Sequence, residues 1–121
     1  MKTVLLIDDD EDIRFIVDTI LNAAEDFTCH TASNRQEGVR LAQSLRPDLI
    51  LLDVVLGTDR GEEVYQDLRS REETRPIPIV FLTGSTRPED NDRLLRLGAA
   101  GLIAKPFQPD HLIDTLRSYL A

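Results

Sequence analysis

The chain has 121 residues, of which 41% are hydrophobic and 30% charged, and its formal net charge is −8. This length suits one globular domain, and the negative charge argues against direct binding to nucleic acid. The single cysteine excludes an internal disulfide. We find no signal-peptide pattern and no apolar run long enough to span a membrane, so we expect a cytoplasmic protein without membrane contacts.

The first predicted elements are a strand and a helix. Residues 4–7 form a short aliphatic run that ends at Asp8 and Asp9. A helix is predicted from about residue 11 to 24, because its acidic start complements the helix dipole. Its apolar face is expected to contain residues at helical spacing, namely Ile13, Phe15, Ile16, Ile20, Leu21 and Ala24.

A second strand and a second helix follow. Residues 27–32 alternate weakly and predict a shorter strand. Ser33 or Asn34 followed by Glu37 offers a capping box for a helix that continues to Leu45.

The third strand carries the most informative residue of the chain. Residues 49–52 are four consecutive large aliphatics, and Asp53 follows them directly. Such a run is typical of a strand buried on both faces of a parallel sheet. Residues 57–61 then predict a polar loop with two glycines, followed by a helix over about 62–72.

The second half of the chain repeats this alternation. The predicted elements are a strand over 79–82 that ends at Thr83, a helix from Pro88 to a C-cap at Gly98, a strand over 101–104 that ends at Lys105, and a helix from Asp110. Five strands alternating with five helices predict a parallel sheet covered on both sides.

Polar side chains follow four of these five strands: Asp8, Asp9, Asp53, Thr83 and Lys105. In an open parallel sheet, groups at the carboxyl ends of the strands meet at one edge. Three crowded carboxylates favour a cation among them, and oxygen ligands suit Mg²⁺. A lysine and a hydroxyl beside them can bind an oxyanion, so the pattern indicates phosphoryl transfer onto an aspartate.

Other chemistries lack their motifs. No glycine-rich phosphate loop is present, which argues against nucleotide binding. His30 and His111 have no partner motif for a hydrolase, and together with Cys29 they lack the spacing of a zinc site.

These residues resemble the receiver domains of two-component response regulators, of the CheY-like type. The resemblance covers residues 1–121 and rests on four motifs in order: Asp8-Asp9, Leu-Leu-Asp53, Leu-Thr83-Gly84 and Lys105-Pro106-Phe107. It implies a single flavodoxin-like, doubly wound α/β domain, whose five-stranded parallel sheet has the order 2-1-3-4-5 and carries five helices.

The resemblance also implies a function. Asp53 would accept a phosphoryl group from a phosphohistidine of a sensor histidine kinase or a histidine phosphotransfer protein. Thr83 and Lys105 would bind the phosphoryl oxygens. The implied Mg²⁺ ligands are the carboxylates of Asp9 and Asp53 and the backbone carbonyl of Val55, with Asp8 acting mainly through water. The domain would catalyse its own phosphorylation from small donors and its own slow dephosphorylation, without being a conventional enzyme.

The sequence departs from the family at three positions. Gly57 replaces a common proline, Arg60 stands where many relatives have aspartate, and Leu102 replaces the aromatic residue that usually moves together with Thr83. We nevertheless expect phosphorylation to repack the fourth helix and the fifth strand, because Thr83 and Lys105 are intact.

Three alternatives remain open at this stage. They are a non-phosphorylated look-alike that acts only in protein interaction, an aspartate-nucleophile phosphatase of the haloacid dehalogenase type, and a flavodoxin-like flavin binder. The downstream target is undetermined, as is whether the chain is free-standing or part of a larger protein. Leu94, Leu97, Ile103 and the last helix either belong to the core or form the surface of a phosphorylation-dependent dimer.

Overall fold

The structure is a computed structural model that describes residues 1–120 of the chain. In chain order the elements are β1 (Lys2–Ile7), α1 (Glu11–Ala23), β2 (Phe27–Ala32), α2 (Arg35–Leu45), β3 (Leu49–Asp53), β4 (Val55–Leu56), β5 (Asp59–Arg60), α3 (Gly61–Ser70), β6 (Ile79–Thr83), α4 (Pro88–Leu97), β7 (Gly101–Ala104) and α5 (Pro109–Leu120). None of the helices in this range combines the length and the apolar content that crossing a membrane requires.

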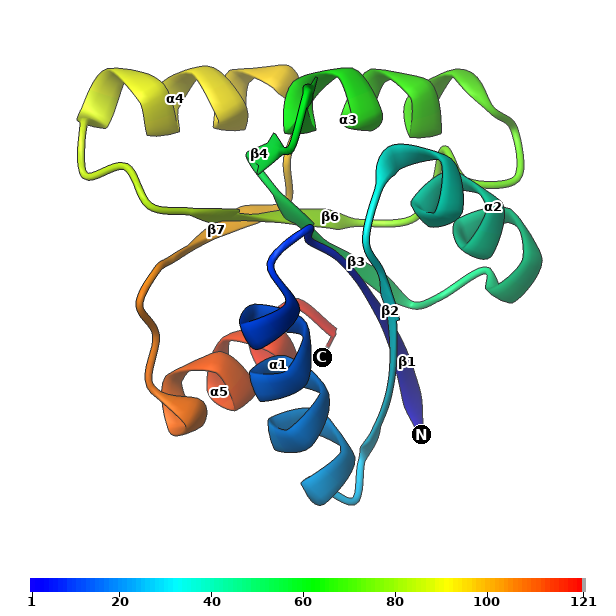
Figure 1. Cartoon of the computed structure of the whole chain (residues 1–121), viewed down its shortest axis with the longest axis vertical. Helices are drawn as coiled ribbons and strands as arrows, with labels where there is room; N and C mark the ends of the chain where they lie inside the picture. The colour runs from blue at the N-terminus through cyan, green and yellow to red at the C-terminus, as the bar shows by residue number, and fades with distance from the viewer. Residues whose placement is uncertain (121) are drawn as a thin grey trace.

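Five strands form one parallel sheet in the order β2-β1-β3-β6-β7 (Figure 1). Since β6 and β7 are the fourth and fifth strands of this sheet along the chain, the predicted order 2-1-3-4-5 is confirmed. The register pairs Val4 of β1 with Leu49 of β3, and Ile50 of β3 with Ile79 of β6. β1, β3 and β6 are therefore interior strands.

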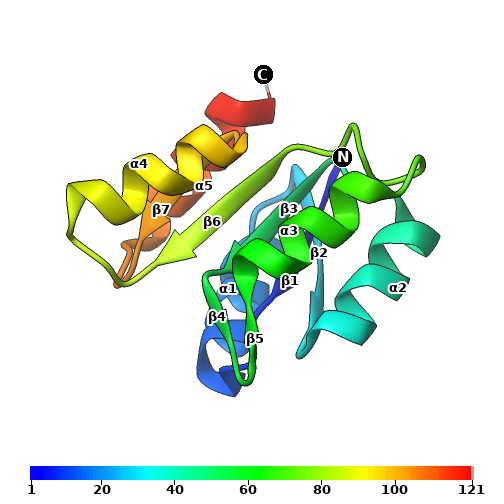
Figure 2. The same cartoon turned by 90° about the horizontal axis from the view of Figure 1, so that it is seen from above.

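Helices cover both faces of the sheet, as Figures 1 and 2 show: α2, α3 and α4 lie on one face, and α1 and α5 lie on the other. Alternate residues of the central strands pack against the helices on opposite faces of the sheet. Leu5 and Ile7 pack with the first group of helices, whereas Val4 and Leu6 pack with the second. Burial on both faces is the reason that these strands are unbroken aliphatic runs.

The predicted helix starts rest on local hydrogen bonds. The Asn34 side chain accepts a hydrogen bond from the backbone N–H of Glu37 at 2.9 Å, and the Glu37 carboxylate accepts one from the N–H of Ser33 at 3.0 Å. The first bond satisfies an amide that the first turn of α2 cannot pair internally, and the second holds the residue just before the cap Asn34. Gly98 follows the last residue of α4 with φ 120°, which confirms its role as C-cap.

The predicted apolar face of α1 was partly wrong. Phe15 and Ile16 are 71% and 44% exposed, whereas Val17 and Leu21 are fully buried. Residues two positions apart point to nearly opposite sides of a helix, so the face that contains Val17 turns Phe15 toward solvent. Leu95 of α4 is another large apolar side chain that faces solvent, with 46% exposure.

The segment expected to be a polar loop is a small antiparallel hairpin. β4 pairs with β5 through Val55 with Arg60 and Leu56 with Asp59. Gly57 begins the two-residue turn with φ 58°, a value that glycine adopts without steric cost. Helix α3 then begins at Gly61 and ends at Ser70, slightly earlier than the predicted range of about 62–72.

Four of the leucine and isoleucine residues considered for a dimer surface belong to the core. Leu94 and Ile103 are each only 1% exposed. Leu112 and Leu116, the buried residues of α5, are fully covered by the layer they share with α1. These four side chains therefore pack in the core of this structure, and a phosphorylation-dependent dimer stays a prediction.

Candidate functional site

The polar residues that follow the parallel strands meet at one edge of the sheet. Asp8 and Asp9 follow β1, Asp53 ends β3, and Lys105 follows β7. The three aspartates each offer a carboxylate oxygen, and these oxygens lie within 4.8 Å of one another. Lys105 Nζ lies 3.1 Å from Asp8 Oδ2 and 3.2 Å from Asp53 Oδ1. Residues 97 positions apart thus form one cluster of charges.

Thr83 lies beside this cluster at the end of β6. It is paired with Ala104 across the sheet, and its carbonyl accepts a hydrogen bond from the N–H of Lys105 at 2.8 Å. Thr83 is only 4% exposed, and its Oγ1 accepts a hydrogen bond from the N–H of Ser85 at 3.1 Å. Because that bond uses an acceptor position, the hydroxyl proton stays free to donate to an oxyanion.

Asp8 is fully buried and is held by neighbouring groups. Its Oδ1 accepts a hydrogen bond from the N–H of Asp10 at 2.9 Å, and its Oδ2 accepts one from Lys105 at 3.1 Å. A buried carboxylate requires such partners, since an unpaired buried charge costs several kcal/mol. Asp9, the next residue, is exposed. One member of the acidic pair therefore anchors Lys105, and the other faces solvent.

The surroundings of Asp53 disfavour its ionised form. Burial and the negative charge of Asp8 raise its pKa to about 6, although Lys105 and the Val55 amide act in the opposite direction. The Val55 N–H donates to Asp53 Oδ1 at 3.3 Å, and the side chain keeps 13% exposure. Asp53 is therefore an accessible carboxylate whose ionised form is incompletely compensated.

Lys105 is the cation nearest to these acids. Burial alone would lower its pKa, but hydrogen bonds and attraction from Asp8 and Asp53 outweigh burial and hold the pKa above its usual value. Lys105 is therefore positively charged at neutral pH. One positive charge faces three carboxylates, so the site carries a net negative charge.

The chain turns sharply just after Asp53. The N–H of Gly61 donates to the carbonyl of Val54 at 2.7 Å, and a Cβ on Gly61 would collide with the backbone oxygen of Asp53. A Cβ on Gly57 would lie 3.8 Å from Asp9 Oδ2, so the β4–β5 hairpin borders the acidic cluster. Only glycine at position 61 lets α3 begin this close to the phosphoacceptor candidate.

Two contributing residues were not found from the sequence. Arg14 of α1 donates from Nη1 to the backbone carbonyl of Asp8 at 2.8 Å, which fixes the segment after β1. Ser85 Oγ donates to Asp90 Oδ2 at 2.8 Å and so joins the Thr83 turn to α4. The Thr-Gly-Ser spacing was a usable signal for Ser85, because such hydroxyls commonly form local turns, whereas Arg14 carried none.

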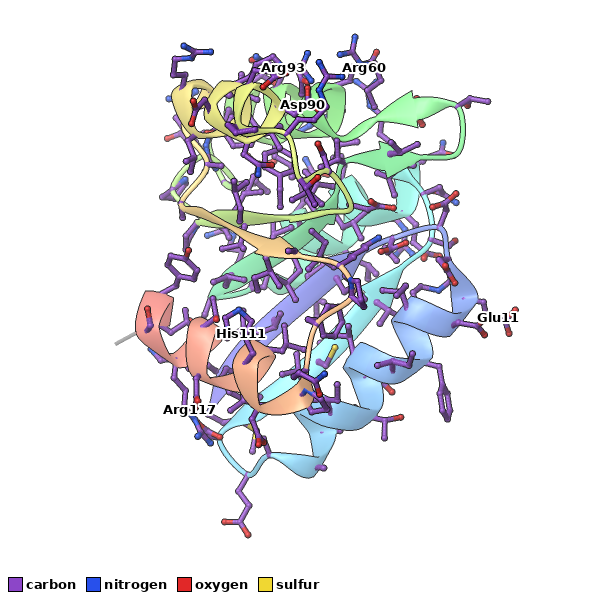
Figure 3. All side chains as sticks on the ribbon, turned by 90° about the vertical axis from the view of Figure 1, so that its left-hand side faces the viewer. Glu11, Arg60, Asp90, Arg93, His111 and Arg117 are labelled. Atoms are coloured by element: carbon purple, nitrogen blue, oxygen red, sulfur yellow. The ribbon has the colours of Figure 1, made fainter. Side chains whose placement is uncertain are left out.

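The two histidines lie on different elements of the fold. His30 lies on the edge strand β2, and His111 lies exposed in the first turn of α5 (Figure 3). Cys29 is buried beside His30, and burial raises the pKa of its thiol to about 12. These residues are not part of the acidic cluster.

A doubly wound parallel sheet with an acidic cluster and a lysine at its carboxyl edge defines the receiver class of α/β proteins. The sequence model of the response regulator receiver domain matches residues 4–117. The chain therefore belongs to the response regulator receiver domain family and is CheY-like.

Two bacterial regulatory proteins are similar in sequence to this chain. The chain is 35% identical to the phosphate regulon transcriptional regulatory protein PhoB of Pseudomonas aeruginosa over 98% of its own length and 52% of that protein. It therefore spans about half the length of that relative. It is 33% identical to the polar-differentiation response regulator DivK of Brucella anthropi, over 98% of this chain and 96% of that one.

Solved structures agree with the fold. The chemotaxis protein CheY4 of Vibrio cholerae superposes with a TM-score of 0.92 at 34% identity, covering 99% of both chains. The receiver domain of sensor histidine kinase PA1611 from Pseudomonas aeruginosa superposes with a TM-score of 0.87 at 25% identity, covering 98% of this chain and 97% of that one. That structure holds a magnesium ion coordinated in its active site cleft.

The donor set of this chain fits a magnesium ion. Mg²⁺ prefers oxygen ligands, takes one or two carboxylates and keeps several waters. The clustered oxygens of Asp8, Asp9 and Asp53 match these demands, and the acidic triad is typical of the magnesium site of receiver domains. The surplus negative charge of the cluster also favours a divalent cation.

Proposed function

We propose that residues 1–121 act as one receiver domain whose Asp53 accepts a phosphoryl group from a phosphohistidine. The donor would be a sensor histidine kinase or a histidine phosphotransfer protein, and the reaction would require Mg²⁺. The observation that carries the proposal is the position of Asp53, a partly exposed carboxylate within 3.2 Å of the Lys105 ammonium. Family membership supports it, because an aspartate acceptor is typical of receiver domains. A cytoplasmic location suits the single reduced cysteine.

The proposed magnesium ligands are the carboxylates of Asp9 and Asp53 and the backbone carbonyl of Val55, with Asp8 acting through a bound water. When bound, the ion neutralises negative charge on the carboxylates and on phosphoryl oxygens. The magnesium ion in the PA1611 receiver domain supports this assignment.

The proposed reaction uses this chain's own groups in simple roles. A carboxylate oxygen of Asp53 attacks phosphorus, the phosphorus–nitrogen bond of the phosphohistidine breaks, and its electron pair returns to the imidazole nitrogen. Lys105 Nζ and the Thr83 hydroxyl bind the phosphoryl oxygens as negative charge shifts onto them. Attack of water on phosphorus later releases inorganic phosphate and restores the carboxylate. Small phosphodonors would react in the same way.

We propose that the conformational change after phosphorylation of Asp53 reaches α4 through hydrogen bonds rather than through residue 102. Thr83 Oγ1 accepts from the Ser85 N–H, and Ser85 Oγ donates to Asp90 Oδ2 in α4, whose position Figure 3 shows. A Thr83 hydroxyl that turns toward a phosphoryl oxygen would disturb this chain of bonds. Asn91 Oδ1, on the same turn of α4, is buried without a hydrogen-bond partner among the described residues. An unsatisfied buried oxygen favours a repacked α4.

The phosphoacceptor assignment predicts a change in mass. Incubation with acetyl phosphate and Mg²⁺ is expected to add one phosphoryl group to the wild-type protein, measured by intact mass spectrometry. Asp53→Asn should stay at its unmodified mass, because an amide is not a competent nucleophile. Asp59→Asn, a matched change in the nearby hairpin, should be modified like the wild type. A wild-type protein that gains no mass would contradict the proposed function.

The conformational change is tested separately by nuclear magnetic resonance. Beryllofluoride with Mg²⁺ is expected to shift backbone amides across residues 84–107 of the wild type and to leave those of Asp53→Asn unchanged. Ser85→Ala should keep the shifts near Asp53 but reduce those in α4, since the bond from Ser85 to Asp90 is lost. Identical wild-type spectra over residues 84–107 with and without the mimic would show that this region does not switch.

A further inference from the structure

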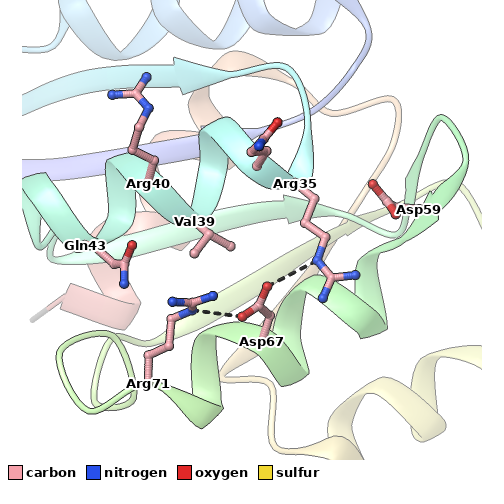
Figure 4. A pocket seen from close by; sticks show the side chains of 8 residues that line it. Arg35, Val39, Arg40, Gln43, Asp59, Asp67 and Arg71 are labelled. Carbon is pink, nitrogen blue, oxygen red and sulfur yellow. Dashed lines mark hydrogen bonds and ion pairs between the residues drawn. The ribbon is translucent and has the colours of Figure 1, made fainter.

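A second polar site lies between α2 and α3 (Figure 4), and its lining shares no residue with the acidic cluster. It is a pocket of about 460 Å³, and we name it the α2–α3 pocket. Its charged lining residues are Arg35, Arg40, Asp59, Asp67 and Arg71, and Val39 forms an apolar part of its wall. A volume of this size lies in the range of small-molecule sites.

Asp67 fixes two of the three arginines in a defined arrangement. Arg35 Nε donates to Asp67 Oδ2 at 3.2 Å, and Arg71 Nε donates to Asp67 Oδ1 at 2.9 Å. The two bonds use both carboxylate oxygens, as the dashed lines in Figure 4 show. Together they hold the pKa of Asp67 below its usual value although burial acts in the opposite direction. Asp67 is therefore ionised, and one carboxylate orients both guanidinium groups.

The terminal amino groups of these arginines remain available. Within residues 1–120, the hydrogen bonds of the Arg35 and Arg71 side chains come from Nε, and their Nη atoms donate none. The two side chains are 38% and 40% exposed, so the unused donors can reach a ligand. Guanidinium groups present such donors in a planar fork that matches phosphate oxygens.

The charges of the pocket favour an anion. Three arginines face two aspartates in its lining, which leaves one net positive charge on a protein of net charge −8. Gln43, also in the lining, donates from Nε2 to Glu73 Oε1 at 2.7 Å, which orients its amide. A single carboxylate would occupy one guanidinium fork and leave the other empty. A group with several oxygens and at least two negative charges uses both.

We propose that the α2–α3 pocket binds a small organic phosphate, whose phosphoryl oxygens contact the Nη groups of Arg35 and Arg71 and whose organic part lies against Val39. This site needs no glycine-rich loop, because the guanidinium groups supply the donors that backbone amides supply in such loops. It is independent of phosphoryl transfer at Asp53.

The test uses the full chain in buffer without magnesium, with ATP, AMP and inorganic pyrophosphate as separate probes. Binding is followed by calorimetry and by the Nε–H signals of Arg35 and Arg71. ATP is expected to bind and to shift both signals. The double variant Arg35→Gln/Arg71→Gln should bind about tenfold more weakly or worse, since it loses charge-assisted hydrogen bonds. AMP and pyrophosphate then distinguish recognition of the nucleoside from recognition of the phosphates alone.

A matched control keeps the test independent of net charge. Arg87→Gln removes the same kind of charge from an exposed ion pair at the start of α4, and it should bind ATP like the wild type. Equal weakening in both variants, shifts centred on Lys105 instead of the two arginines, or no binding of any probe at millimolar concentration would overturn the proposal. Thermal unfolding of each variant shows whether a loss of binding reflects a loss of folding.

Discussion

A Gly61→Ala substitution is expected to lower the free energy of unfolding by about 3 kcal/mol, the upper part of the range for forced overpacking. A Cβ at this position would collide with the backbone oxygen of Asp53 and lie 2.9 Å from the Cα of Val54. Both obstacles are main-chain atoms, so no side-chain rotation can relieve them. The 2.7 Å hydrogen bond from the Gly61 N–H to the Val54 carbonyl would lengthen or break. Urea unfolding followed by circular dichroism measures the change.

Gly84→Ala is the matched control for this substitution. A Cβ on Gly84 would have no heavy atom within 4 Å. Its stability is therefore expected to stay the same or to rise by about 0.5 kcal/mol through the smaller entropy of the unfolded chain. If Gly61→Ala were as stable as Gly84→Ala, the close approach of α3 to Asp53 would be wrong. Slower phosphorylation of a folded Gly61→Ala protein would show that the same contact also positions Asp53.

An Asp53→Asn substitution is expected to stabilise the magnesium-free protein, by about 1 to 2 kcal/mol at about pH 8. The folded protein raises the pKa of Asp53 from 3.8 to about 6, chiefly through burial and then through Asp8. A shift of this size corresponds to at most about 3 kcal/mol, and the partial exposure of the side chain reduces it. Asparagine keeps the shape of the side chain and removes the charge that causes this cost.

The sign of the pH dependence follows from the raised pKa. Between about pH 4 and pH 6 the folded state holds a proton on Asp53 that the unfolded state has released, so the stability of the wild type falls as the pH rises through this window. Below pH 4 both states are protonated and the penalty disappears. The gain in unfolding free energy from Asp53→Asn should therefore be small near pH 4 and reach its full size above about pH 7.

Urea unfolding in the presence of a chelator, repeated across this pH range, measures the difference. Asp59→Asn serves as the control and is expected to change stability by no more than about 0.5 kcal/mol at any pH. Added Mg²⁺ should stabilise the wild type more than Asp53→Asn, because a ligand that binds the folded state stabilises it. The difference in unfolding free energy between these two proteins should therefore become smaller. An Asp53→Asn protein that is less stable than the wild type at high pH would contradict the electrostatic account of the site.

Stability and function thus make opposite demands at Asp53. The carboxylate destabilises the metal-free fold, because it lies close to Asp8 in a partly buried position. The same crowding creates the negative charge that suits a divalent cation, and the exposed part of the side chain can meet a donor. Strain of this kind is common where a protein positions groups for chemistry.

Much of the architecture could be predicted from the sequence because its causes are local. The aliphatic run at residues 49–52 is buried on both faces as predicted, and the cap formed by Asn34 and Glu37 is present. Strand, helix and cap signals involve residues a few positions apart, so they can be read along the chain. The meeting of Asp8, Asp53 and Lys105 followed from one topological rule, that the carboxyl ends of parallel strands share an edge.

Contacts between distant segments could not be predicted in this way. The sequence alone determined the alternating strands and helices, their caps and the set of polar residues at the strand ends. Only the tertiary structure decided that Val17 and not Phe15 faces the core, that Asp8 is buried while Asp9 is exposed, and that Arg35 and Arg71 share Asp67. The physical reason is that hydrogen bonding and periodicity act over a few residues, whereas burial and charge pairing depend on which faces the packed helices and sheet bring together.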